Sequence, residues 1–185
     1  MSIIFESENR KKALREVAEK MMIAARTAPK GCGIDNLVIC VAEGETIKEI
    51  SNKMKEIVHR GNGSDIFERD ADNILSAHAI VLIGTKIKPL GIKYCGLCGF
   101  ENCEGKEKNP ESPCAFNSGD LGIAVGSAVS IASDNRVDNR IMFTVGKAVR
   151  ELGFMGNDVK IIYGIPLSSS GKNPFFDRKA RCKKE

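Results

Sequence analysis

Apolar residues recur at helical spacing in the first part of the chain. Between positions 7 and 28 they fall three and four residues apart, with charged residues on the other face, which predicts an amphipathic helix. Pro29 and Gly31 follow directly and are expected to end it. Short continuous apolar runs then predict three buried strands, at 37–41, 79–84 and 159–163.

Helical spacing returns in four later segments. Thr46 and Glu49 have the spacing of a capping box for the first of them, and Gly61 is expected to end it. The other three are expected at 65–76, at about 118–132 with Ser118 or Asp120 as the cap, and at 139–152 ahead of Gly153.

Composition fits an ordinary globular protein. Hydrophobic residues make up 42% of the 185 positions and charged residues 28%, and a chain of this length buries enough surface to fold without a metal. No repeat, low-complexity segment or linker divides it. Residues 1–185 are therefore expected to form a single α+β domain, with a small sheet flanked by helices.

Net charge and the N-terminal sequence bear on nucleic-acid binding and on export. The net charge of +4 is modest and the signs are mixed, so nucleic acid is not expected as a partner. Only Ile3, Ile4 and Phe5 form an apolar run before charges begin, which predicts neither a signal peptide nor a membrane span. A cytoplasmic protein is the expectation.

The segment 94–116, YCGLCGFENCEGKEKNPESPCAF, holds four of the seven cysteines. Cys95 and Cys98 are separated by two residues, a spacing that lets one tight turn present two sulfurs to the same group; Cys103 and Cys114 follow. The segment has neither helical nor strand periodicity, so burial in a core does not account for its thiols. We expect an inserted loop that binds a metal centre.

Three interpretations of the four thiols compete. Disulfides are disfavoured, because nothing marks the chain for export and cytosolic thiols stay reduced. Structural zinc commonly uses two CxxC pairs, whereas this loop has one pair and two single cysteines. Iron–sulfur clusters accept wider spacings, which favours one [4Fe–4S] cluster on Cys95, Cys98, Cys103 and Cys114. A zinc-binding, non-catalytic interaction module remains the alternative.

The order Cys-x2-Cys-Gly-x3-Cys with a more distant fourth cysteine resembles the cluster module of Rnf-type electron-transport and corrinoid iron–sulfur proteins. The whole chain resembles a family of small prokaryotic proteins described as containing a ferredoxin domain (DUF2148). This resemblance implies a cluster, single-electron transfer and a redox partner protein.

Three other segments, AARTAPKGCGIDNL, DLGIAVGSAVSIAS and VKIIYGIPLSSSGKNPFFDRK, resemble parts of the nitroreductase-like flavoprotein fold in the same order. That resemblance implies an FMN-dependent oxidoreductase in which the helix at 120–133 packs in the core of a homodimer. By position, the residues expected to face the flavin are Pro29, Lys30, Gly31 and Cys32. Those expected to meet its phosphate are Lys172 or Arg178.

Two short motifs leave alternatives open. GIPLSSSGKN is not a Walker A loop, because six residues separate Gly164 from Gly171 and Asn173 replaces the Ser or Thr that would hold magnesium. It is either a site for a flavin phosphate or a plain surface turn. Cys32, between two glycines and near Lys30, is either a redox-active thiol or a small residue in a turn.

Overall fold

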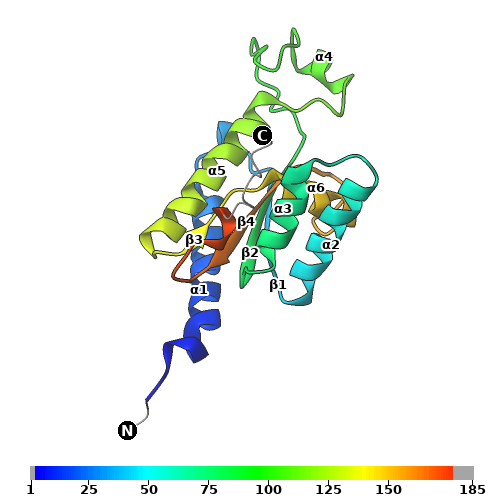
Figure 1. Ribbon diagram of the computed structural model, residues 1–185. Helices are drawn as coiled ribbons and strands as arrows, with labels where there is room; N and C mark the ends of the chain where they lie inside the picture. The colour runs from blue at the N-terminus through cyan, green and yellow to red at the C-terminus, as the bar shows by residue number, and fades with distance from the viewer. Residues whose placement is uncertain (1–2, 177–185) are drawn as a thin grey trace, which may run out of the picture.

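A computed structural model describes residues 3–176 and contains one four-stranded antiparallel sheet (Figure 1). The strands lie in the order β1-β2-β4-β3, and they span β1 (Leu37–Glu43), β2 (Ala79–Lys86), β4 (Val159–Ser168) and β3 (Asp138–Asn139). In the register, Leu37 lies opposite Thr85, which lies opposite Ile161, so these residues mark one end of the sheet. Ala79 and Leu167 pair near the other end.

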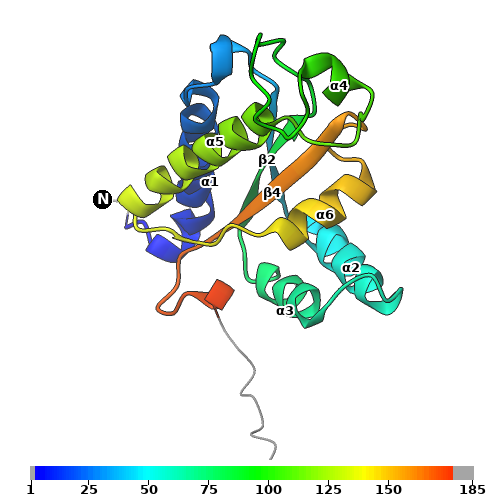
Figure 2. The ribbon, with the colours of Figure 1, turned by 90° about the horizontal axis from the view of Figure 1, so that it is seen from above.

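Helices cover both faces of the sheet. Those of the described chain are α1 (Glu6–Thr27), α2 (Glu45–His59), α3 (Asp65–Ile74), α4 (Cys103–Glu107), α5 (Ala115–Asp134) and α6 (Phe143–Leu152), with 3-10 turns η1 (Gly31–Gly33) and η2 (Pro174–Phe176). Figure 2 shows α1 and α5 on one side of β2 and β4, and α2, α3 and α6 on the other.

Two hydrophobic cores result, one on each face of the sheet. Strand β2 is buried on both sides because its side chains alternate: Ile80 and Leu82 enter the core under α2, α3 and α6, whereas Val81 and Ile83 enter the core under α1 and α5. This explains why its sequence is a continuous apolar run. The sheet core holds the scaffold together independently of the loop between β2 and α5.

The long helices and the three strands predicted from the sequence are confirmed, but several boundaries were wrong. Helix α2 begins at Glu45 after a sharp turn at Gly44 (φ 58°), so Thr46 lies inside the helix and caps nothing. Helix α5 begins at Ala115, because Cys114 is its N-cap residue; the expected caps Ser118 and Asp120 lie within it.

The region after α5 differs from the sequence prediction in two ways. Residues Asp138 and Asn139 pair with the end of β4 as a short strand, and Met142 pairs with Gly164, so α6 begins only at Phe143. Strand β4 continues to Ser168, which places the first half of GIPLSSSGKN inside the sheet. The expected loop is therefore limited to residues 169–173.

Within residues 3–176, no helix combines the length and the apolar character needed to cross a bilayer.

Candidate functional site

The cysteine-containing segment leaves the sheet after β2 and returns at the start of α5. It projects beyond the end of the sheet and carries the short helix α4, at the top of Figure 1. Its base is fixed to the scaffold by the amide of Lys88, which donates to Asn117 Oδ1 at 2.7 Å. The loop thus extends from the scaffold as a separate segment, and this hydrogen bond holds its base in place.

The four cysteines of this loop line one hollow. Cys114 is buried, with 6% of its surface exposed, and Cys95, Cys98 and Cys103 are half-buried. The remaining wall is largely apolar and includes Leu90, at the exit from β2, and Phe116 of α5. The structure therefore brings together all four residues that the spacing selected.

The thiols line the same hollow but do not converge on one point. The free space between them is about 10 Å³, roughly that of one water molecule, so a bound cluster requires the loop side chains to move apart. In the described part of the chain, no group of three or more His, Cys, Asp or Glu side chains is arranged to hold a metal ion. The donor set suits a cluster, in which each iron takes one cysteine.

A buried lysine completes the wall of this hollow. Lys106 lies on α4, one helical turn after Cys103, and only 2% of its surface is exposed. It forms no ion pair with any other described residue. Its positive charge at the wall of the hollow favours negative charge there.

An unsatisfied buried amide lies at the start of α5. Asn117 is 1% exposed; its oxygen accepts the Lys88 amide, but its Nδ2 has no hydrogen-bond partner among the described residues. The residue follows Cys114 by three positions, so both lie on neighbouring parts of one helical turn. An N–H donor in this position suits an acceptor such as thiolate or sulfide sulfur.

The turn at Pro29–Cys32 packs against the same hollow from outside. The Gly31 amide donates to Asp120 Oδ1 at 3.0 Å, and a Cβ added to Gly31 would lie 2.7 Å from side-chain carbons of Leu90 and Phe116. A side chain at this position would force Leu90 and Phe116 to move. Cys32 is exposed and has a left-handed backbone (φ 54°).

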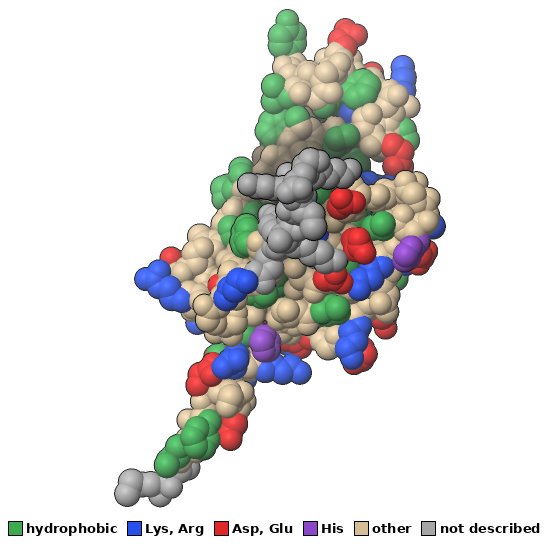
Figure 3. All heavy atoms as spheres, viewed as in Figure 1, with side chains coloured by type: hydrophobic (Ala, Val, Ile, Leu, Met, Phe, Trp, Pro, Cys, Tyr) green, Lys and Arg blue, Asp and Glu red, His purple; other side chains and the backbone are tan. Residues whose placement is uncertain are grey.

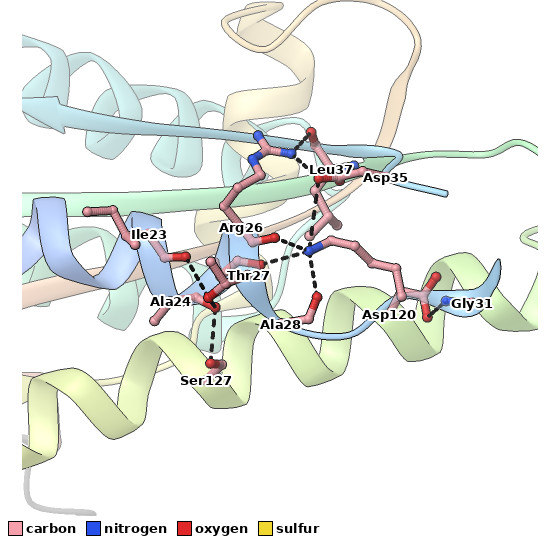
Figure 4. Close-up of polar contacts among 12 residues, drawn as sticks. Ile23, Ala24, Arg26, Thr27, Ala28, Gly31, Asp35, Leu37, Asp120 and Ser127 are labelled. Carbon is pink, nitrogen blue, oxygen red and sulfur yellow. Dashed lines mark hydrogen bonds and ion pairs between the residues drawn. The ribbon is translucent and has the colours of Figure 1, made fainter. Parts of the chain in front are cut away.

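Lys30 has a structural role that the sequence did not suggest. Its Nζ donates to the carbonyls of Ala25 (3.2 Å), Ala28 (2.7 Å) and Arg26, which closes the C-terminal end of α1 (Figure 4). The side chain is 6% exposed. A contact from Lys30 to a flavin would have to use its backbone.

Asp35 connects this helix end to β1. Burial raises the pKa of its carboxyl, but hydrogen bonds from Arg26 and from the Leu37 amide, together with the nearby Lys30 charge, outweigh it and lower the pKa overall. The carboxylate form therefore holds the turn that leads from α1 into the sheet.

The chain is similar along nearly its whole length to an uncharacterized protein of Archaeoglobus fulgidus. The two are 38% identical over 184 residues, covering 95% of this chain and 97% of its relative. A sequence profile described as "Uncharacterized protein containing a ferredoxin domain (DUF2148)" matches residues 111–178. The chain belongs to this DUF2148 family. Of the four loop cysteines, the matched range includes Cys114 alone.

The fold of this DUF2148 protein is that of the nitroreductases. The nitroreductase CinD from Lactococcus lactis in complex with 4-nitrophenol superposes with a TM-score of 0.62 at 12% identity, covering 85% of this chain and 79% of that chain. A nitroreductase with bound FMN from Desulfitobacterium hafniense gives 0.59 at 12% identity, covering 85% and 78%. The predicted fold class is confirmed.

The two parts of the expected flavin site are not brought together within one chain of this DUF2148 protein. The turn at Pro29–Cys32 lies at the sheet end marked by Leu37, Thr85 and Ile161. Lys172 follows the opposite end of β4, where its side chain is exposed, and Arg178 lies outside the described residues. One flavin can contact both regions only if two copies of the chain supply them.

Sequence reasoning selected the four cysteines but missed the groups around them. Nothing in the sequence singles out Lys106 among the charged residues of the loop, and Asn117 has no signal beyond its position three residues after Cys114. Leu90 and Phe116 were equally inconspicuous, because their role is to separate the hollow from the Pro29–Cys32 turn. Contacts between distant segments define all of these roles.

Proposed function

We propose that this DUF2148 protein is an iron–sulfur redox protein in which Cys95, Cys98, Cys103 and Cys114 hold one [4Fe–4S] cluster. The observation that carries the proposal is the gathering of all four thiols around one hollow. When bound, the cluster supplies reversible one-electron chemistry, and four cysteine ligands leave no open iron position for a substrate.

The surrounding side chains support this assignment. The Lys106 ammonium offsets part of the negative charge that four thiolates bring into the hollow. Asn117 does not line the hollow, but its unpartnered Nδ2 belongs to a residue three positions after Cys114 and is a candidate N–H donor to sulfur; the apolar wall limits access of water.

The proposal includes FMN as the second redox group, bound between two copies of the chain. Support comes from the nitroreductase fold and from the Desulfitobacterium neighbour, which has bound FMN. Leu90 and Phe116 form the layer between the cysteine hollow and the Pro29–Cys32 turn, so a flavin on that turn would lie close to the cluster. The proposed protein is therefore an oxidoreductase that passes single electrons between the cluster, FMN and a partner protein.

The outer face of α5 supports the two-copy arrangement. Its exposed positions before the last residue, Asp134, are small or apolar (Ser118, Gly119, Gly122, Ile123, Gly126, Ser130 and Ser133), and the helix is apolar around most of its circumference. Figure 3 shows mainly green and tan spheres along the upper part of this helix. Such a helix normally has protein on both sides.

A zinc-binding interaction module would use the same thiols differently. A single zinc ion needs its ligands to meet at one point, whereas a cluster takes thiols that lie farther apart, so either metal centre would require the loop side chains to rearrange. Free thiols also suit the cytoplasm, the compartment we propose, and all six described cysteines are free.

Metal analysis of anaerobically purified protein tests the proposal. We expect about four iron and four acid-labile sulfide per chain, a brown colour, and FMN released on denaturation. Cys98→Ser is expected to lose the cluster, whereas Cys32→Ser, at a thiol that does not line the hollow, is expected to keep it. A colourless protein with one zinc per chain, or equal loss from both variants, would contradict the cluster assignment.

A further inference from the structure

A second hollow lies on the other side of the cysteine loop, between α6 and the beginning of β4. Figure 2 shows these two elements next to the loop that carries α4. The hollow has a volume of about 240 Å³, somewhat below the range of about 300–1,000 Å³ typical for drug-sized ligands. It has room for a small molecule only.

Positive charge surrounds this hollow. Lys147 and Arg150 are three residues apart on α6 and therefore project to the same side, and Lys160 comes from β4. Glu111, from the cysteine loop, is the only acidic residue in the lining. Lys147 forms no ion pair with another described residue, so the site has more positive than negative charge.

The Glu111 carboxylate already occupies the position of an anion there. Its Oε1 lies 3.2 Å from Lys160 Nζ and its Oε2 lies 3.5 Å from Arg150 Nη2, so the two cations hold one carboxylate between them. The Glu111 side chain is nevertheless 71% exposed, because it reaches in from the rim and is not packed. A carboxylate from solution can take its place at little cost.

The remaining lining is apolar and aromatic. Phe143 lies at the start of α6, and Ile161 and Tyr163 lie along β4, beside Pro113 of the cysteine loop. These side chains suit a flat apolar body, and they offer little to a hydrated inorganic anion. The combination of cations with aromatic surface is typical of sites for organic acids.

We propose that this hollow binds a small organic acid with an apolar or aromatic body, whose carboxylate replaces that of Glu111 between Lys160 and Arg150. The site goes beyond the proposed redox function, since it needs neither cluster nor flavin to form. It adjoins the cysteine loop through Glu111 and Pro113, and Pro113 directly precedes Cys114. An acid bound here would therefore contact the segment that holds the proposed cluster.

Calorimetric titration of the anaerobically purified full-length protein with benzoate, at constant ionic strength, tests the site. We expect saturable one-to-one binding of benzoate and none of benzamide, its neutral counterpart. Lys160→Met is expected to weaken binding about tenfold or more, as for loss of one charge-assisted hydrogen bond. Lys48→Met, at an exposed lysine on α2 outside this lining, is the matched control and should leave binding unchanged.

Glu111→Gln is expected to strengthen benzoate binding, which a substitution that only damaged the site would not do. Because it removes the internal competitor, it is expected to tighten benzoate binding several-fold. Absence of benzoate binding, equal binding of benzamide, preference for inorganic phosphate, or weaker binding in Glu111→Gln would each overturn the proposal. Iron content measured on the same samples keeps this outcome separate from failure of the cluster assignment.

Discussion

Lys106 has almost no exposed surface and no ion pair within residues 3–176, yet it lies in a wall of cysteines. A lysine in that situation is destabilising unless negative charge is nearby. The contribution of Lys106 to the stability of the protein should therefore depend on whether the thiols hold a cluster. In the cluster-free protein the lysine is expected to destabilise the fold, and beside an anionic cluster it is expected to stabilise it.

Lys106→Met separates these two states. In the cluster-loaded protein we expect the reduction potential to fall, by an amount on the order of tens of millivolts, because a positive charge that favours the reduced form is removed. In the cluster-free protein the same substitution should raise the free energy of unfolding by about 1 kcal/mol or more. Redox titration and urea denaturation measure the two effects.

Lys108→Met is the matched control for this substitution. Lys108 follows α4 in the same loop but is exposed to solvent. Its charge is screened by water, so neither quantity should change appreciably. Equal shifts of the potential in both variants would show that Lys106 acts only through the overall charge of the loop.

At the scale of elements, α6 packs directly against the backbone of β4. Gly146 of α6 faces the backbone of β4, and a Cβ added there would lie 1.7 Å from the carbonyl oxygen of Ile162. The helix packs directly on the strand because this position has no side chain. The second hollow depends on this contact, since Gly146 and Ile162 both line it.

Gly146→Ala is expected to destabilise the protein by several kcal/mol, because one of two backbones must move. The free energy of unfolding in urea measures it. Gly171→Ala is the control, since the added methyl group meets nothing within 4 Å. If the two variants unfolded at the same urea concentration, that result would contradict the close packing of α6 on β4 at Gly146.

Elements with a strong pattern could be predicted from the sequence, and short ones could not. Helix α1 and strand β2 have clear helical spacing and a continuous apolar run, and both were predicted nearly to their ends. Strand β3 contains only the polar residues Asp138 and Asn139, which form a strand because the end of β4 pairs with them. Helix α4 is five residues long and has no periodicity to detect.

At the scale of the whole molecule, cysteine spacing selected four residues that line one hollow, but it did not indicate what surrounds them. The spacing of Cys95, Cys98, Cys103 and Cys114 is local information, and the structure gathers all four. The cations around Glu111 come from α6 and β4, which are distant in the sequence, so no motif reveals them. Long-range packing determines the second hollow entirely.

The proposed homodimer makes a prediction at this scale. Gly126 is exposed on α5, and a Cβ added there meets no atom within 4 Å. If two copies pack through this helix, Gly126→Arg places a charged side chain at their contact and should yield a monomer. Light scattering coupled to size-exclusion chromatography measures the mass.

Asn52→Arg provides the comparison for this experiment. Asn52 is exposed on α2, on the opposite side of the sheet from α5, so the added charge should leave the dimer intact. A wild-type monomer, or a Gly126→Arg protein that remains dimeric, would refute packing through α5.

The cysteine loop stands outside both hydrophobic cores: none of its residues from Tyr94 to Cys114 belongs to either core, and Lys88 and Asn117 tie down its base. If the loop holds the proposed cluster, the polypeptide can therefore fold first and receive the cluster afterwards. Iron starvation would then leave a folded, cluster-free protein in the cell, which could still take up a cluster and would not be degraded.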